Sequence, residues 1–122
     1  MFFMIFSVSC RINIKVIMAD NRILKFIDSS YKECEVTGRD MGGDYEYEIP
    51  VESLALGSVK WPQNRIPDHG VYIIEIADDC IKVEVFNVSH RCSEHFTLYR
   101  GEKKRRSYMF GEWSYGYTIW VE

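Results

Sequence analysis

Apolar and polar residues alternate without interruption from position 6 to position 16, in the run FSVSCRINIKV. A period of two places alternate side chains on opposite faces of a β-strand. We therefore predict a strand here with one buried and one solvated face. The alternation continues through the point where a signal-peptide cleavage site would lie, and no basic residue precedes Phe2. These features favour a strand of the folded domain over a secretory signal.

The same periodicity predicts strands at 45–49, 81–85 and 113–119, with shorter strands at 33–36 and 95–100. Residues 71–76 are nearly all apolar, which is typical of a central strand covered on both faces. The alternation after 81 changes phase at Phe86, a pattern that indicates a β-bulge. Two readings stay open for 23–31. One is a hairpin strand after an Asp20-Asn21 turn, and the other is a helix capped by Asp20.

The segments between these strands predict turns and loops. Residues 37–44 (TGRDMGGD) are rich in residues that tolerate positive φ, and 58–70 contain two prolines, so both read as irregular connections. Residues 51–57 have room for one or two helical turns ending at Gly57. The fold class that follows is mostly β, a single domain over residues 1–122. Its antiparallel sheet of about eight strands would be closed as a barrel or folded as a sandwich.

Composition supports a globular domain. The chain has 122 residues, 47% of them hydrophobic and 15% aromatic, which suits one β-rich domain. A net charge of −3 argues against a general binder of nucleic acid or membranes. No apolar run reaches the ~18 residues of a membrane helix. The cysteines at 10, 34, 80 and 92 match no zinc or redox spacing, so we expect reduced thiols in a cytoplasmic protein.

Carboxylates gather between residues 28 and 52, where eight acidic and two basic residues give a local charge of −6. Positions 44, 46 and 48 share one strand face, and 33 and 35 join them if their strands pair. Like charges side by side on a sheet are destabilising, so this row predicts a docking surface for a basic partner. The alternative is a solvated outer face. The candidate partner-binding residues are Glu33, Glu35, Asp44, Glu46 and Glu48.

A basic run follows at 103–106, and residues 91–107 carry six basic and two acidic residues, or +4. Basic side chains beside exposed rings bind single-stranded nucleic acid in many proteins. The alternative is a solvated hairpin tip, because Trp113, Tyr115 and Tyr117 alternate in phase with Ile119 and so read as core. The candidate nucleic-acid-binding residues are Lys103, Lys104, Arg105, Arg106 and Tyr108.

Other chemistry has little support in the sequence. His90, Cys92 and His95 are close enough to suggest zinc, but a strand would turn position 95 away from the other two, and His69 or Cys80 would have to complete the site. Phosphate loops, dinucleotide-binding glycines and nucleophile elbows are absent from the sequence. We therefore expect no metal, no cofactor and no catalytic residue.

These observations predict a non-enzymatic protein-binding or inhibitor protein. Its most concrete form is a small acidic immunity protein or antitoxin that occludes a basic toxin or nuclease in the cytoplasm. The alternative is a β-barrel that binds single-stranded nucleic acid through the basic run. The identity of the partner is open.

Overall fold

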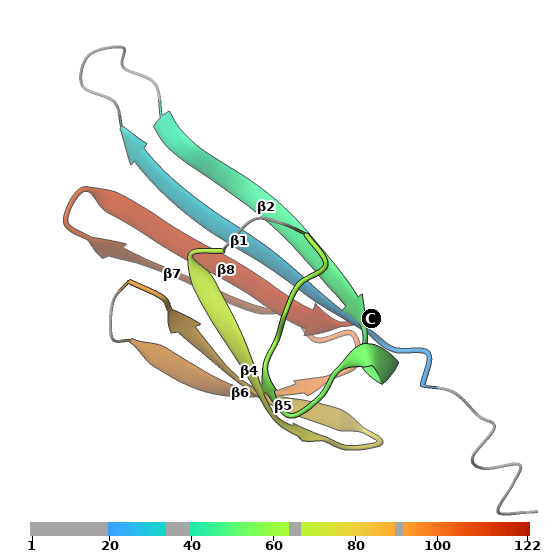
Figure 1. The fold of residues 1–122 in the computed structure, drawn as a ribbon. Helices are drawn as coiled ribbons and strands as arrows, with labels where there is room; N and C mark the ends of the chain where they lie inside the picture. Colours follow the sequence, from blue (N-terminus) through green and yellow to red (C-terminus); the bar gives the residue numbers. More distant parts are fainter. Residues whose placement is uncertain (1–19, 34–39, 64–66, 90–91) are drawn as a thin grey trace, which may run out of the picture.

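The computed structural model describes residues 20–33, 40–63, 67–89 and 92–122 (Figure 1). The strands are β1 (Ile23–Glu33), β2 (Asp40–Pro50), β3 (Gly57–Ser58), β4 (His69–Ile76), β5 (Cys80–Asn87), β6 (Ser93–Tyr99), β7 (Lys104–Phe110) and β8 (Trp113–Val121). They form two four-stranded antiparallel sheets, ordered β2-β1-β8-β7 and β3-β4-β5-β6. The predicted mostly-β class is confirmed, and of the two architectures left open the structure is a sandwich.

One hydrophobic core lies between the two sheets. Alternation in β1 directs Leu24 and Phe26 inward, and both are completely buried. Burial of each such side chain contributes about 1.5–3 kcal/mol. The rest of the core comes from β8 in the same sheet and from β4, β5 and β6 in the facing sheet, and it includes Ile119, Val121, Val71, Ile73, Ile81, Val83, Phe96 and Leu98.

The two sides of the sandwich differ. On the side of β2 and β3, the connection at 51–63 packs Val51, Leu54 and Trp61 against the core. On the other side, the edge strands β6 and β7 belong to different sheets and are bridged by an ion pair between Glu94 and Arg106. This second side contains the pocket described below.

Two strand predictions are wrong in detail. Strand β4 is covered on one face only, because its sheet is an outer layer of the sandwich, and Tyr72 and Ile74 are 44% and 41% exposed. No bulge occurs at Phe86, since β5 pairs with β6 in unbroken register from Cys80 to Phe86. The irregularity lies instead in β4, between Ile73 and Glu75.

The segment at 23–31 is a strand, so the helical reading is wrong. Its backbone is hydrogen-bonded on both sides, to β2 and to β8. Since both edges of the strand are occupied, the predicted hairpin with the residues before Asp20-Asn21 is wrong as well. The loop predicted at 37–44 is shorter than expected, because β2 begins at Asp40. Gly42 has φ +97°, and a Cβ there would lie 1.9 Å from the Ser30 carbonyl oxygen, so this strand position requires glycine. The predicted strands at 6–16 and at 34–36 lie outside the described residues.

Helical structure within the described ranges is confined to the 3₁₀ turn η1 (Val51–Ser53), inside the segment where helical turns were predicted. The predicted irregular connection at 58–70 is interrupted by the end of β3 and by His69 and Gly70, which begin β4. None of the described residues belongs to a helix that is long and apolar enough to cross a membrane.

Candidate functional site

The acidic row lies on the edge strand β2. Asp44, Glu46 and Glu48 are exposed on the outer face of the sheet, while Tyr45 and Tyr47 between them turn toward the core. The three carboxylates therefore share one face, as the alternation predicts. Glu33 ends β1, where it pairs with Asp40, and Glu35 lies outside the described residues.

The charge of this row is only partly compensated. Lys25, across the strand pair, contacts Glu48 at 3.4 Å and Glu122 at 2.7 Å. Asp44 and Glu46 form no ion pair with any cationic side chain in the described part of the chain. The row therefore presents uncompensated negative charge at the edge of the sheet.

The same outer face is hollowed beside the row. One hollow of about 290 Å³ is lined by residues of β1, β2 and β8 and by Gln63 of the connection, and the outward-facing ones among them are Lys25, Ile27, Glu46, Glu48 and Trp120. A second of about 410 Å³ reaches across the sheet from Asp44 on β2 to Arg105 on β7. The face thus runs from an acidic edge over a mixed apolar centre to a basic edge.

The predicted nucleic-acid-binding residues do not share one surface. Arg105 contacts Thr118 on the outer face, and Lys103 lies 4.4 Å from the centre of the Trp120 ring. Arg106 points the other way, toward the edge of the core. Its Nη2 lies 2.6 Å from a Glu94 oxygen and its guanidinium 5.0 Å from the Phe96 ring centre. The Tyr108 hydroxyl also turns inward.

The Glu94–Arg106 pair makes three side-chain hydrogen bonds of 2.6–3.0 Å. The Arg106 guanidinium accordingly lowers the pKa of the Glu94 carboxyl, and Glu94 raises the pKa of Arg106. Such a bidentate contact is stronger than a single surface ion pair. The guanidinium of Arg106 on β7 is therefore paired with the Glu94 carboxylate on β6.

The candidate zinc residues are not brought together. Cys92 lines the pocket on the inner side of β6, whereas His95 is exposed on the outer side, 3.7 Å from Glu84. His90 lies outside the described residues. The described ranges contain no group of three His, Cys, Asp or Glu side chains able to bind a metal ion.

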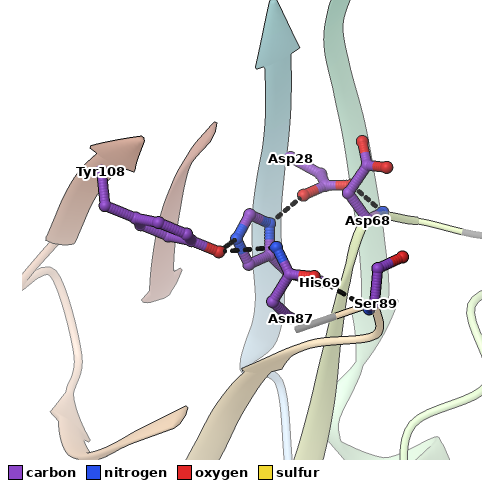
Figure 2. Close-up of polar contacts among 6 residues, drawn as sticks. All are labelled: Asp28, Asp68, His69, Asn87, Ser89 and Tyr108. Carbon is purple, nitrogen blue, oxygen red and sulfur yellow. Dashed lines mark hydrogen bonds and ion pairs between the residues drawn. The ribbon is translucent and has the colours of Figure 1, made fainter. Parts of the chain in front are cut away.

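A buried polar network joins the two sheets (Figure 2). Asp28 follows Leu24 and Phe26 in the inward phase of β1, and His69 precedes Val71 in the inward phase of β4. Both side chains are 1% exposed, and Asp28 Oδ1 lies 2.5 Å from His69 Nδ1. Asp28 Oδ2 accepts a hydrogen bond of 2.6 Å from the Asp68 backbone N–H. Each carboxylate oxygen therefore has a partner, as burial of a charge requires.

The network continues from the far side of the imidazole ring (Figure 2). His69 Nε2 lies 2.5 Å from the Tyr108 hydroxyl, which also accepts a hydrogen bond of 2.8 Å from Asn87 Nδ2. Asn87 Oδ1 in turn accepts from the Ser89 backbone N–H at 2.9 Å. Side chains of β1, β4, β5 and β7 are thereby connected through one histidine.

Aromatic rings enclose the histidine. The centre of the Tyr117 ring lies 4.8 Å from that of His69, and Tyr108 meets the imidazole edge-on at 5.6 Å. Burial raises the pKa of the Tyr108 hydroxyl and raises that of Tyr117 to about 12. Both hydroxyls therefore keep their protons at alkaline pH values at which an unperturbed tyrosine loses its own.

These pKa values predict a biphasic alkaline titration of the eight tyrosines. Folded Tyr108 and Tyr117 should keep their protons above pH 10, where unfolded tyrosines lose theirs. The unfolded state then binds fewer protons, so stability falls as pH rises from about 10 to 12. Ultraviolet absorbance after a rapid pH jump should show a delayed fraction that urea abolishes and that Tyr108→Phe reduces. A single step for all eight in the native state would contradict this assignment.

A pocket of about 440 Å³ lies next to the network, between the edge strands β6 and β7. His69, Asn87 and Tyr108 line it together with apolar side chains. The sequence interpretation missed this site: Asp28 counted only as one of many carboxylates and His69 only as a possible extra zinc ligand. The available signal was local, because both polar residues fall in the buried phase of their strands.

Comparison with known proteins adds no assignment. No protein-family model, curated protein or solved structure matches the chain. The function therefore has to be inferred from the geometry and chemistry of the described residues.

Proposed function

We propose that the protein is a non-enzymatic binding protein that docks the outer face of the β2-β1-β8-β7 sheet on a basic region of a partner protein. The observation that supports this most directly is the row of exposed carboxylates Asp44, Glu46 and Glu48 on an edge strand. Two of the three have no cationic partner in the described part of the chain. A field of one sign speeds association with a partner of opposite sign and selects against others.

The centre of the face favours a protein partner. Ile27 and Trp120 are partly exposed there and line the hollow beside Glu46 and Glu48. Protein interfaces commonly combine an apolar or aromatic centre with a charged rim, and tryptophan is enriched among the residues that dominate their binding energy. A side chain of the partner that enters the hollow would be buried from water.

The narrower form of the proposal is an immunity-type inhibitor acting in the cytoplasm. Enzymes that bind nucleic acid need basic side chains around their substrate path, because each phosphate carries a negative charge. An acidic strand laid over such a path competes directly with the substrate. A toxic nuclease is therefore a partner whose surface complements this face.

Charge reversal of the row tests the proposal. Each Glu→Lys change adds two charges, so Glu46→Lys with Glu48→Lys moves the formal net charge from −3 to +1. Asp78→Lys with Asp79→Lys makes the same change at exposed positions of the turn between β4 and β5, in the other sheet. Loss of close charge pairs costs about 2–5 kcal/mol. We expect the first pair of changes to weaken binding at least ~30-fold and the control pair to leave it within ~3-fold.

The partner is obtained by a tagged pull-down from the native host, with and without nuclease, at low and moderate salt. A basic protein that survives nuclease, binds in purified form and slows hydrogen exchange in β2, β1 and β8 supports the proposal. Equal loss of binding in both charge-reversal variants would mean that binding depends on the net charge of the protein and not on the acidic row. Recovery that disappears with nuclease would favour the nucleic-acid alternative instead.

A further inference from the structure

We propose that the pocket between β6 and β7 binds a small, uncharged, largely apolar molecule through a hydrogen bond from a ligand hydroxyl or similar donor to the Tyr108 oxygen. The pocket lies at the edge of the sandwich and is lined by residues of β4, β5, β6, β7 and β8 and by Cys92. It shares no carboxylate with the acidic row. A ligand here is therefore a second function, independent of the proposed docking face.

The size and lining of the pocket suit a small molecule. Its volume of about 440 Å³ falls in the range of natural ligand sites, which are mostly apolar with a few convergent polar groups. Val85 and Tyr117 are buried at its inner wall, at 1% and 6% exposure. Phe110 stands at the rim, 40% exposed, with its ring centre 5.9 Å from that of Tyr108. An aromatic ring in the pocket would contact these side chains.

The charges around the pocket favour an uncharged ligand. The charged residues that line it are the anionic Glu94 and the cationic Arg106, and their bidentate contact pairs the two charges with each other. An anion would have to displace Glu94 from Arg106, and a cation would have to displace Arg106 from Glu94. A neutral molecule leaves this pair intact and avoids the cost of burying a charge.

The polarity of the Tyr108 hydroxyl follows from the network behind it. The Asp28 carboxylate only accepts, so His69 Nδ1 donates to it, and in the tautomer with its proton on Nδ1 alone Nε2 accepts from the Tyr108 hydroxyl. The hydroxyl proton is thereby committed to His69. The oxygen accepts one hydrogen bond from Asn87 and has a second acceptor position. The Cys92 thiol also lies beside this hydroxyl and raises its pKa, and a thiol is a weak hydrogen-bond partner that a ligand hydroxyl would outcompete.

The network also fixes the hydroxyl before any ligand arrives. Asp28, His69 and Asn87 are at most 5% exposed, and each is hydrogen-bonded from a strand of the sandwich. A preorganised acceptor costs little conformational entropy on binding. Recognition of one donor group is therefore the expected role of a network that ends at a pocket.

Para-cresol, toluene and para-methylanisole test the proposal on the unmodified protein. All three have a methylated ring, but only para-cresol has a hydroxyl donor. One hydrogen bond contributes about 1 kcal/mol, so we expect para-cresol to bind about fivefold more tightly than the other two. Titration is followed by the methyl resonance of Met109, at the pocket rim, and by peptide-resolved alkylation of Cys92, which a bound ligand should slow.

Two variants separate the hydrogen bond from the apolar contacts. Tyr108→Phe should make para-cresol bind like toluene, whereas Phe110→Ala should weaken all three ligands and leave their ratio unchanged. Absence of binding by all three, or equal affinity of para-cresol and para-methylanisole, would overturn the proposal even if Tyr108→Phe does not fold. The variant Glu46→Lys with Glu48→Lys should bind para-cresol normally, which distinguishes this site from the docking face.

Discussion

Replacing Asp28 by Ala should lower the free energy of unfolding by about 3 kcal/mol or more. The carboxylate is 1% exposed and accepts hydrogen bonds from His69 Nδ1 and from the Asp68 backbone N–H. Alanine leaves the buried His69 Nδ1–H and the part-buried Asp68 N–H without an acceptor, and an orphaned buried group costs about 1–3 kcal/mol. Urea unfolding followed by circular dichroism measures the loss.

Asp28→Asn is the matched control, with an expected loss of about 1 kcal/mol. The amide oxygen can accept from the Asp68 N–H, and the amide NH₂ can donate to His69 Nδ1. The histidine proton then moves to Nε2 and donates to the Tyr108 oxygen. If Ala and Asn at position 28 destabilise the protein equally, the charge and not the hydrogen-bond pattern joins the sheets. If neither does, the network does not join them.

Replacing Phe26 by Ala should cost about 3–5 kcal/mol, the range for loss of a fully buried aromatic ring. Phe26 has no exposed surface, and its ring stacks on Trp61 with centres 5.6 Å apart and planes 4° from parallel. The rings of Tyr47 and Tyr117 lie 6.3 and 6.1 Å away. The change therefore opens a cavity where the connection at 51–63 closes the core. Urea unfolding measures the loss of stability, and tryptophan fluorescence reports the change around Trp61.

Phe26→Leu is the comparison, since it keeps most of the apolar volume and should cost about 1.5 kcal/mol. The emission of Trp61 should shift in the Ala variant, because its indole loses the stacked ring, and the shift should vanish when Trp61→Phe is added. An Ala variant no less stable than the Leu variant would mean that the connection collapses into the space at no cost.

The β class was predictable because alternation is a local property of the backbone. Lys25 and Phe26, or Lys82 and Val83, reveal which side of a strand is wet without any knowledge of its partners. Whether a second layer covers the other face of a strand depends on residues far away in the sequence, so alternation does not reveal it. Tyr72 and Ile74 are apolar yet lie on the outer face of β4, so an apolar run at 71–76 was mistaken for a strand buried on both faces.

In the polar network, too, the local features were predictable from the sequence and the non-local ones were not. Asp28 in phase with Phe26, and His69 in phase with Val71, each indicate a buried polar side chain from the sequence alone. Their pairing depends on β1 and β4 facing each other from different sheets, which sequence spacing does not give. The basic run that precedes Tyr108 predicts a nucleic-acid surface for this residue. Its alternation with Arg105 and Met109 turns it inward instead.

The central position of β8 in its sheet has a consequence for synthesis of the chain. Strand β1 pairs with β8 from Leu24↔Val121 to Tyr31↔Ser114. Of the described strands, β1 is synthesised first and β8 last, so this pairing can form only after β8 has been synthesised. Until β8 leaves the ribosome, β2 is the one partner that the described strands offer β1, and a two-stranded hairpin is marginally stable in water. Closing so long a loop is entropically costly and slow. We therefore expect Leu24 and Phe26 to stay accessible to solvent during translation until β8 pairs with β1.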